Sequence, residues 1–188
     1  MKKLMILLFA VLTCMTGYAQ HLKFKGIPLE GTLTNFVTQL KAKGFSYIET
    51  DNGIAYLQGE FAGHKGCTVG VATFSGTQNV CRVTTVFPEQ DTWASASNDY
   101  YTLKAFLREK YGEPISVEKF QNDYVDSDVS KRHAIVNGEG NFISTFTTEG
   151  GKIELTIRKS GPIKLCIVLN YYDNENSLKV RQQIMDDL

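Results

Sequence analysis

Two residues in a glycine-flanked segment have side chains that could form a nucleophile. His64 lies three residues before Cys67 in the run Gly63-His64-Lys65-Gly66-Cys67. An imidazole that lowers the pKa of a neighbouring thiol turns a cysteine into a nucleophile. The pair therefore suggests an enzyme. A solvated histidine in a turn, close to a structural cysteine, has the same spacing, and we expect this second arrangement.

Three aspartates have a spacing that can bind calcium. Asp123, Asp126 and Asp128 lie in a polar segment, but the glycine and the distal glutamate of an EF-hand loop are absent. The three histidines are far apart, and the sequence has no Cys-x-x-Cys, no P-loop, no G-x-G-x-x-G and no G-x-S-x-G. We therefore expect a solvated acidic loop, with no metal and no cofactor.

The tyrosines are the better guide to function. The chain has nine tyrosines and one tryptophan, and such side chains bury a large area on binding with little loss of entropy. Trp93, Tyr100 and Tyr111 fall at helical spacing, so we expect them in the core. Tyr56 and Tyr172 are predicted on an exposed sheet face, where they could contact a protein or stack on sugar rings.

The first residues are typical of a secretory signal. Lys2 and Lys3 precede an apolar run, and Gly17-Tyr18-Ala19 offers the small residues that a signal peptidase requires. The sequence thus predicts a signal peptide over residues 1–19, export to the periplasm or the medium, and no integral membrane segment in the mature chain. Loss of the two lysines changes the formal net charge from 0 to −2, which gives no electrostatic reason to bind nucleic acid.

The second half of the chain repeats the first at an offset of 85 residues without gaps. Several matching residues are typical of turns, such as Asn52-Gly53 in the first copy. The match indicates that one β-rich unit was used twice. The eight identities are Asn52/Asn137, Gly53/Gly138, Phe61/Phe146, Gly66/Gly151, Ser75/Ser160, Gly76/Gly161, Cys81/Cys166 and Val83/Val168.

Three cysteines remain after the predicted processing. Cys81 and Cys166 occupy equivalent repeat positions, so a pseudo-twofold axis could bring them together as one disulfide. The alternative is that both are small buried apolar residues. In either case the odd number, which includes Cys67, leaves at least one cysteine as a free thiol or in an intermolecular bond.

The hydrophobic spacing predicts the elements of each copy. The first copy is a helix over 33–40, capped by Thr32, then strands at 45–50, 55–61, 67–74 and 80–87. The second is a helix over 93–107, capped by Asp91, then strands at 133–136, 141–147, 152–159 and 164–172, and a final helix from Leu178 capped by Asn174 or Asn176. Residues 115–131 are interpreted as an insertion, formed by a strand followed by a mobile loop.

The repeat is out of phase in the third strand of each copy. Val69 and Val71 are apolar in the first copy, whereas the apolar Ile153 and Leu155 align with polar or small residues. A shift of one residue turns a strand over. Either Gly70 marks a bulge that restores the phase, or the alignment is locally wrong.

These patterns predict an α+β fold. It would contain duplicated α-β4 units, with antiparallel meander sheets and helices packed on one face. Residues 20–112 would form the first unit with the following helix. Residues 113–188 would form the inserted loop, the second β4 repeat and the C-terminal helix of one pseudo-symmetric domain.

Two resemblances add to this interpretation. The segment from Phe24-Lys25-Gly26-Ile27-Pro28-Leu29 to Gly44-Phe45, behind this type of signal, resembles small uncharacterised exported proteins of gut Bacteroidetes. The element order is similar to that of the tandem repeats of β-lactamase-inhibitory proteins. The second resemblance implies binding of a protein on a sheet face, but only by analogy of fold.

We therefore expect an exported, non-enzymatic binding module. It would hold a protein or a cell-envelope component, such as a glycan, on a sheet face through Tyr56 and Tyr172. The alternatives are an envelope enzyme with a Cys67/His64 nucleophile pair and a structural role in assembly.

Overall fold

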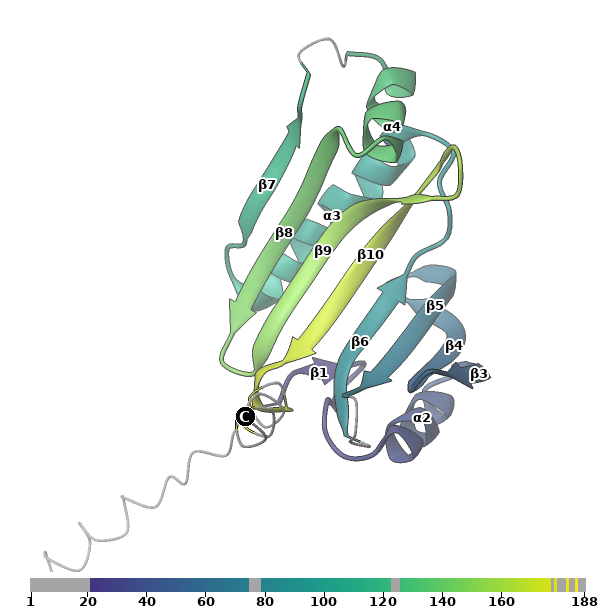
Figure 1. Ribbon diagram of the computed structural model, residues 1–188, viewed down its shortest axis with the longest axis vertical. Helices are drawn as coiled ribbons and strands as arrows, with labels where there is room; N and C mark the ends of the chain where they lie inside the picture. The colour runs from purple at the N-terminus through teal and green to yellow at the C-terminus, as the bar shows by residue number, and fades with distance from the viewer. Residues whose placement is uncertain are drawn as a thin grey trace, which may run out of the picture.

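The structure is a computed structural model that describes residues 21–74, 79–122, 126–176, 178, 182 and 185. The predicted signal peptide and the predicted turn at Ser75-Gly76 lie outside these residues. A short hairpin, β1 (Lys23–Phe24) and β2 (Ile27–Pro28), precedes one large antiparallel sheet (Figure 1). Helices pack against this sheet, so the fold class is α+β, as predicted.

The large sheet has eight strands in the order β3-β4-β5-β6-β10-β9-β8-β7. Every neighbouring pair is antiparallel, and each half of the sheet is a meander. The halves meet where β6 pairs with β10. The bounds are β3 (Ser46–Asp51), β4 (Ile54–Phe61), β5 (His64–Thr73), β6 (Val80–Val86), β7 (Ile115–Phe120), β8 (Gly140–Thr148), β9 (Gly151–Ser160) and β10 (Lys164–Asp173).

One helix precedes each half, α2 (Leu33–Ala42) and α3 (Trp93–Tyr111). The hydroxyl of Thr32 caps α2, as predicted, by accepting from an amide of the first turn. Helix α3 is capped by Thr92 rather than by the predicted Asp91, because the Thr92 hydroxyl accepts from the Ser95 N–H at 3.1 Å.

The predicted strand at 133–136 is wrong, because these residues belong to helix α4 (Asp128–Val136). Ser127 begins this helix with a capping box, in which Ser127 and Ser130 each satisfy a backbone N–H of the other. The four residues that look like a strand are the last turn of the helix. Strand β7 is the strand suggested at the start of the predicted insertion, but it forms the first strand of the second half instead of an addition to it.

Residues that are aligned by the offset of 85 lie on the same face of the sheet in only part of the structure. Phe61 in β4 and Phe146 in β8 are both buried on the helix side. In the β6–β10 pair, Val83 is buried opposite Tyr171, whereas its sequence equivalent Val168 lies on the other face. The ungapped alignment is therefore locally wrong. The symmetry lies in the order of the strands and not in those identities.

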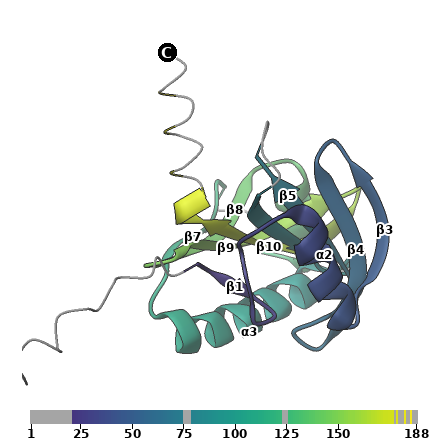
Figure 2. The ribbon, with the colours of Figure 1, turned by 90° about the horizontal axis from the view of Figure 1, so that it is seen from below.

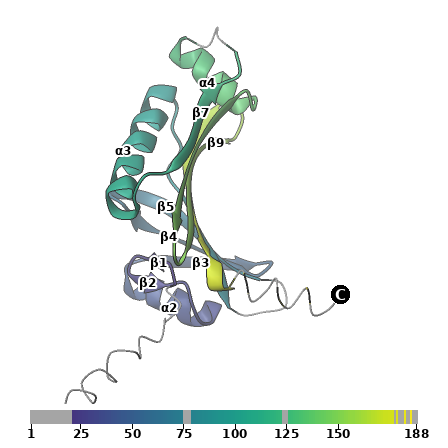
Figure 3. The ribbon, with the colours of Figure 1, turned by 90° about the vertical axis from the view of Figure 1, so that its left-hand side faces the viewer.

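Both helices lie on the same face of the sheet. Helix α3 packs on β8, β9 and β10, and α2 packs on β3 and β5 (Figure 2). Trp93 of α3 packs edge-on against Phe142, with ring centroids 4.7 Å apart. Figure 3 shows α3 along one side of the sheet, while no described helix covers the middle of the other side. We call this uncovered side the open face.

The chain continues as a helix after β10. Residues 174–176, 178, 182 and 185 are helical, and the rest of the predicted C-terminal helix lies outside the described residues. A carboxylate oxygen of Asp173 accepts from the Asn176 N–H at 3.0 Å, so Asp173 caps this helix instead of Asn174 or Asn176. Among the helices that the structure describes, none is long and apolar enough to cross a membrane.

Candidate functional site

Two rows of paired side chains cross the middle of the open face. Paired residues of neighbouring antiparallel strands point to the same side. The first row runs from Tyr56 through Gly70 and Thr84 to Asn170. Its centre is held by a hydrogen bond of 2.7 Å, in which the Thr84 hydroxyl donates to the Asn170 Oδ1 atom. The second row continues beside it.

The second row places Arg82 between the two halves of the sheet. Arg82 pairs with Ala72 of β5 on one side and with Tyr172 of β10 on the other. Tyr172 in turn pairs with Lys152 of β9, whose Nζ atom lies 4.7 Å from the centroid of the Tyr172 ring. The structure thus brings both predicted tyrosines to one face, with Arg82 close to each.

A hollow lies beside Tyr56 because Gly70 has no side chain. A Cβ atom at Gly70 would meet only Ile54 at 3.5 Å and the Tyr56 ring at 3.7 Å, which are ordinary contacts. The hollow has a volume of about 180 Å³. Its walls are formed by Ile54, Tyr56, Thr68, Gly70, Ala72, Arg82, Thr84 and Val86.

Arg82 is the distinctive charge of the open face. It is half-buried, and no described side chain forms an ion pair or a hydrogen bond with its guanidinium. Lys152, in contrast, is paired with Glu154 at 3.3 Å. Partial burial removes some of the water that would otherwise hydrate this guanidinium, and no carboxylate of the described residues compensates for that loss. An anionic group of a binding partner could form the missing ion pair.

The structure does not form the nucleophile suggested by His64 and Cys67. Cys67 is fully buried, and its thiol lies 3.3 Å from the His64 carbonyl oxygen rather than against the ring. Burial raises the pKa of the Cys67 thiol, the opposite of what a nucleophile needs. The His64 ring packs edge-on against Phe87 and faces the Asp99 carboxylate at 3.9 Å.

The possible disulfide between Cys81 and Cys166 is not formed, and both residues are buried free thiols. Cys81 precedes Arg82, which pairs with Tyr172, and Tyr172 lies six residues beyond Cys166 along β10. At about 3.3 Å per residue the two cysteines are roughly 20 Å apart, while a disulfide needs Cα atoms within about 7 Å. In this antiparallel pair, positions 85 residues apart face each other only near Thr84 and Thr85, and both cysteines lie away from that point.

The aspartates considered for calcium do not form a metal site. Asp123 lies outside the described residues. Asp128 accepts from the Trp93 and Ala94 N–H groups at 3.2 and 2.6 Å, so it stabilises the first turn of α3. Over residues 21–74, 79–122 and 126–176, no group of three His, Cys, Asp or Glu side chains is arranged to hold a metal.

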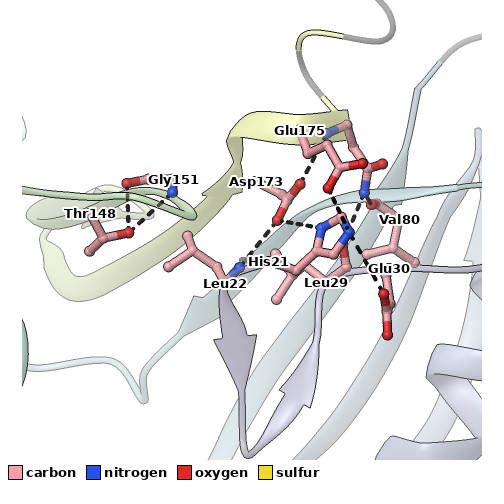
Figure 4. A network of polar contacts seen from close by, with 10 residues as sticks. His21, Leu22, Leu29, Glu30, Val80, Thr148, Gly151, Asp173 and Glu175 are labelled. Atoms are coloured by element: carbon pink, nitrogen blue, oxygen red, sulfur yellow. Dashed lines mark hydrogen bonds and ion pairs between the residues drawn. The ribbon is translucent and has the colours of Figure 1, made fainter. Parts of the chain in front are cut away.

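A second polar cluster joins the start of the described chain to the end of β10 (Figure 4). The buried Asp173 carboxylate contacts His21 Nδ1 at 3.0 Å and accepts from the Leu22 N–H at 3.2 Å. On the other side of the ring, His21 Nε2 lies 3.0 Å from Glu175. Asn176 completes the cluster by donating to two backbone carbonyls.

This cluster is structural in character. Both nitrogens of the His21 ring are engaged by carboxylates, and only 13% of its side-chain surface is exposed. Asp173 is fully buried, and its carboxylate accepts both from Leu22, just before β1, and from Asn176 in the C-terminal helix. We therefore place the candidate site on the open face and treat the cluster as a clasp, hereafter the His21–Asp173 clasp.

Sequence reasoning missed the two residues that shape the candidate site, Arg82 and Gly70. A signal was available for Arg82, since it is the one charged residue in the apolar strand Val80–Val86. A charged side chain on a central strand can reach solvent only if no helix covers that face of the sheet, so Arg82 indicates an uncovered face. Gly70 was noticed as a possible bulge, but the irregularity of β5 lies between Ala72 and Thr73.

Comparisons of the chain with protein-family models, with curated proteins and with solved structures found no match. The fold and the site define an α+β protein with one uncovered face of a large antiparallel sheet. Its function has to be inferred from the chemistry of that face.

Proposed function

We propose that this protein is an exported, non-enzymatic binding module that holds a protein or envelope glycan on the open face. The observation that carries the proposal is the half-buried Arg82, without an ion-pair partner among the described residues, between a hollow and Tyr172. Arginine binds carboxylate, sulfate and phosphate groups through two parallel hydrogen bonds. We therefore expect the partner to present an anionic group to Arg82.

The size of the hollow favours a large partner over a small ligand. Its volume of about 180 Å³ is below the range of roughly 300–1,000 Å³ that is usual for sites that enclose small molecules. A side chain or a single sugar unit of a larger partner would fit it. Tyr56 and Tyr172 would then contact the surface around that inserted group.

The alternative of an envelope enzyme using Cys67 and His64 has weaker support. A nucleophilic cysteine is accessible and has a depressed pKa, whereas the Cys67 thiol is buried with a raised pKa. A purely structural role in assembly would leave Arg82 without a function. Export to the periplasm or the medium remains a prediction from the signal peptide.

Affinity capture tests the proposal. The chain from residue 20 to 188 is used as bait on the envelope and medium of its source cells, and bound material is identified by mass spectrometry. We expect a saturable partner whose recovery falls at least about tenfold with Arg82→Gln, the loss of a charge-assisted hydrogen bond. The control is Arg158→Gln, an exposed arginine on β9.

The tyrosines provide the second arm of this experiment. A Tyr56→Ser/Tyr172→Ser variant should also lose the partner, while Tyr47→Ser, at an exposed tyrosine on the edge strand β3, should retain it. Full capture by both the Arg82 variant and the double tyrosine variant would refute the proposal. Protease or periodate treatment of the bound fraction separates a protein partner from a glycan.

A further inference from the structure

Strand β7 is an unprotected edge of the large sheet. All six of its residues pair with β8 in regular register, and no described strand lies on its other side. Ile115 is 78% exposed and Val117 is 42% exposed, both on the side of the open face. An edge strand presents unpaired backbone N–H and C=O groups that can accept another strand.

The opposite edge of the sheet differs in the features that discourage pairing. Strand β3 is irregular between Tyr47 and Glu49, which twists the edge, whereas both edges carry two charged residues, Glu49 and Asp51 on β3 and Glu118 and Lys119 on β7. Bulges and charges are the usual means by which proteins protect an edge strand. Strand β7 has no bulge, so it is the edge open to strand addition.

Two hollows lie next to each other on the helix side of β7, because α3 packs most closely on β8, β9 and β10 and reaches β7 only through side chains such as Tyr100 and Lys104. The first, of about 440 Å³, includes Ser116 and Arg108. The second, of about 540 Å³, includes Glu118 and Phe120. Tyr101, which is 46% exposed, lines both. The hollows thus lie beside the alternate residues of β7 that point toward α3. The side chains of an added strand would also alternate between the two faces of the sheet, so every second one could enter a hollow.

The charge at these hollows is positive. Lys104 and Arg108 line the first, and Lys119 and Lys131 line the second. Glu118, the acidic residue between them, already binds Lys104 and the Tyr100 hydroxyl. Neither Lys119 nor Lys131 has a side-chain partner within the described part of the chain. In the first hollow Lys104 and Arg108 are already paired with Glu118 and Glu113, so an acidic side chain would meet an unpaired ammonium group only in the second hollow, at Lys131. Lys119 alternates with Glu118, so its ammonium group lies on the side of Ile115 and Val117 and would meet an acidic side chain there.

We propose that β7 is a second docking surface, which takes an extended acidic segment of a partner protein as an additional strand. Backbone hydrogen bonds to β7 would supply the pairing. Polar side chains at alternate positions would enter the two hollows on the helix side, with an acidic one in the second hollow beside Lys131. Apolar side chains at the positions between them would cover Ile115 and Val117 on the other side.

The test uses a synthetic peptide of the predicted pattern, acetyl-Thr-Asp-Val-Asp-Val-Glu-Thr-amide. Amide hydrogen exchange of the full mature chain is measured with and without it. We expect at least about tenfold slower exchange for outward-pointing amides of residues 115–120, because new strand hydrogen bonds protect them. Two control peptides should give no protection: one of the same composition with the acidic residues adjacent, and one with alternate backbone N-methyl groups.

Variants then test the charges. Lys119→Glu with Lys131→Glu should weaken peptide binding at least about tenfold, whereas Lys41→Glu on α2 should leave it unchanged. The proposal is overturned if the N-methylated peptide binds equally well, or if no protection of β7 is found at millimolar peptide. It is also overturned if β7 is protected without peptide in proportion to protein concentration, since a second copy would then be the occupant. Arg82→Gln should not affect the result, so this surface and the open face can fail independently.

Discussion

Arg82 lies directly opposite Tyr172, in the pair of strands that joins the two halves of the sheet. Arg82 belongs to the last strand of the first half, and Tyr172 to the last strand of the second half. The candidate site is therefore a product of the complete sheet. Neither half alone would place a guanidinium beside both Tyr56 and Tyr172.

The hollow on the open face can be filled without harm to the fold. A Cβ atom at Gly70 makes only ordinary contacts, so we expect Gly70→Thr to fold and to gain about 0.5–1 kcal/mol from reduced backbone freedom and better strand propensity. Binding to the partner should be lost, because the new side chain occupies the hollow. Urea unfolding and the capture assay measure the two effects.

Gly59 provides the contrasting glycine. A Cβ atom there would lie 2.5 Å from the Phe45 ring, which is buried in the core. Gly59→Ala should therefore destabilise the fold by about 1–3 kcal/mol through overpacking. If Gly70→Thr proved as destabilising as Gly59→Ala, the description of the hollow would be wrong.

The His21–Asp173 clasp should contribute strongly to stability. Asp173→Asn removes a charge from a buried carboxylate that accepts from Leu22 and Asn176 and contacts His21. We expect a loss of about 2–4 kcal/mol in the free energy of unfolding, since buried charged hydrogen bonds are costly to break. Urea denaturation at neutral pH measures this loss.

Glu30→Gln is the matched control for the clasp. Glu30 lies 3.7 Å from His21 but is exposed, so its removal should change stability by less than about 0.5 kcal/mol. Equal effects of the two substitutions would show that burial of Asp173 is not what makes the clasp important.

Stability should decrease at alkaline pH. Burial raises the pKa of Cys67, Cys81 and Cys166 above the ordinary value of 9.0, and it also raises that of Tyr100 above 10.0. The unfolded chain then loses protons at a lower pH than the folded chain. The contribution of these groups is thus complete below pH 9.0 and declines as the pH rises through their folded-state values.

Urea midpoints between pH 7 and pH 10.5 test this decline. Replacement of the three cysteines by alanine should flatten the curve between pH 9 and 10, leaving the tyrosine contribution at higher pH. A wild-type midpoint that stays constant over the whole range would contradict the assigned burial.

The thiol of Cys67 should react slowly in the folded protein. It is buried with a raised pKa, so alkylation by iodoacetamide at pH 7 should be at least about 100-fold slower than for a free cysteine and should require opening of the structure. Addition of 6 M urea should restore the full rate. Fast alkylation of the folded chain below neutral pH would instead support the envelope enzyme.

Local patterns predicted most of the fold. Alternating apolar residues located seven of the eight strands, and the cap at Thr32 is correct. The strand predicted at 133–136 failed because four residues with an apolar end do not distinguish a strand from the last turn of a helix. The Ser127–Ser130 capping box marks the start of a helix here, but it lies before the four residues that suggested a strand.

The site was less predictable, because it depends on how strands pair. Tyr56 and Tyr172 were identified by type, but their proximity to Arg82 follows from the register of β6 against β10. Register depends on contacts between residues far apart in the sequence, and the spacing of apolar residues within one strand does not reveal these contacts. The same limit produced the Cys81–Cys166 hypothesis, because the sequence does not show that the antiparallel pairing of β6 with β10 places the two cysteines toward opposite ends of the pair.

Photo-crosslinking in the source cells tests the central claim most directly. p-Benzoylphenylalanine replaces Val86, which lines the hollow on the open face, or Phe106, which is exposed on α3. The account predicts a discrete crosslinked partner from position 86, lost when Arg82 is changed to Gln, and none from position 106. A partner crosslinked from position 106 and not from position 86 would contradict binding on the open face.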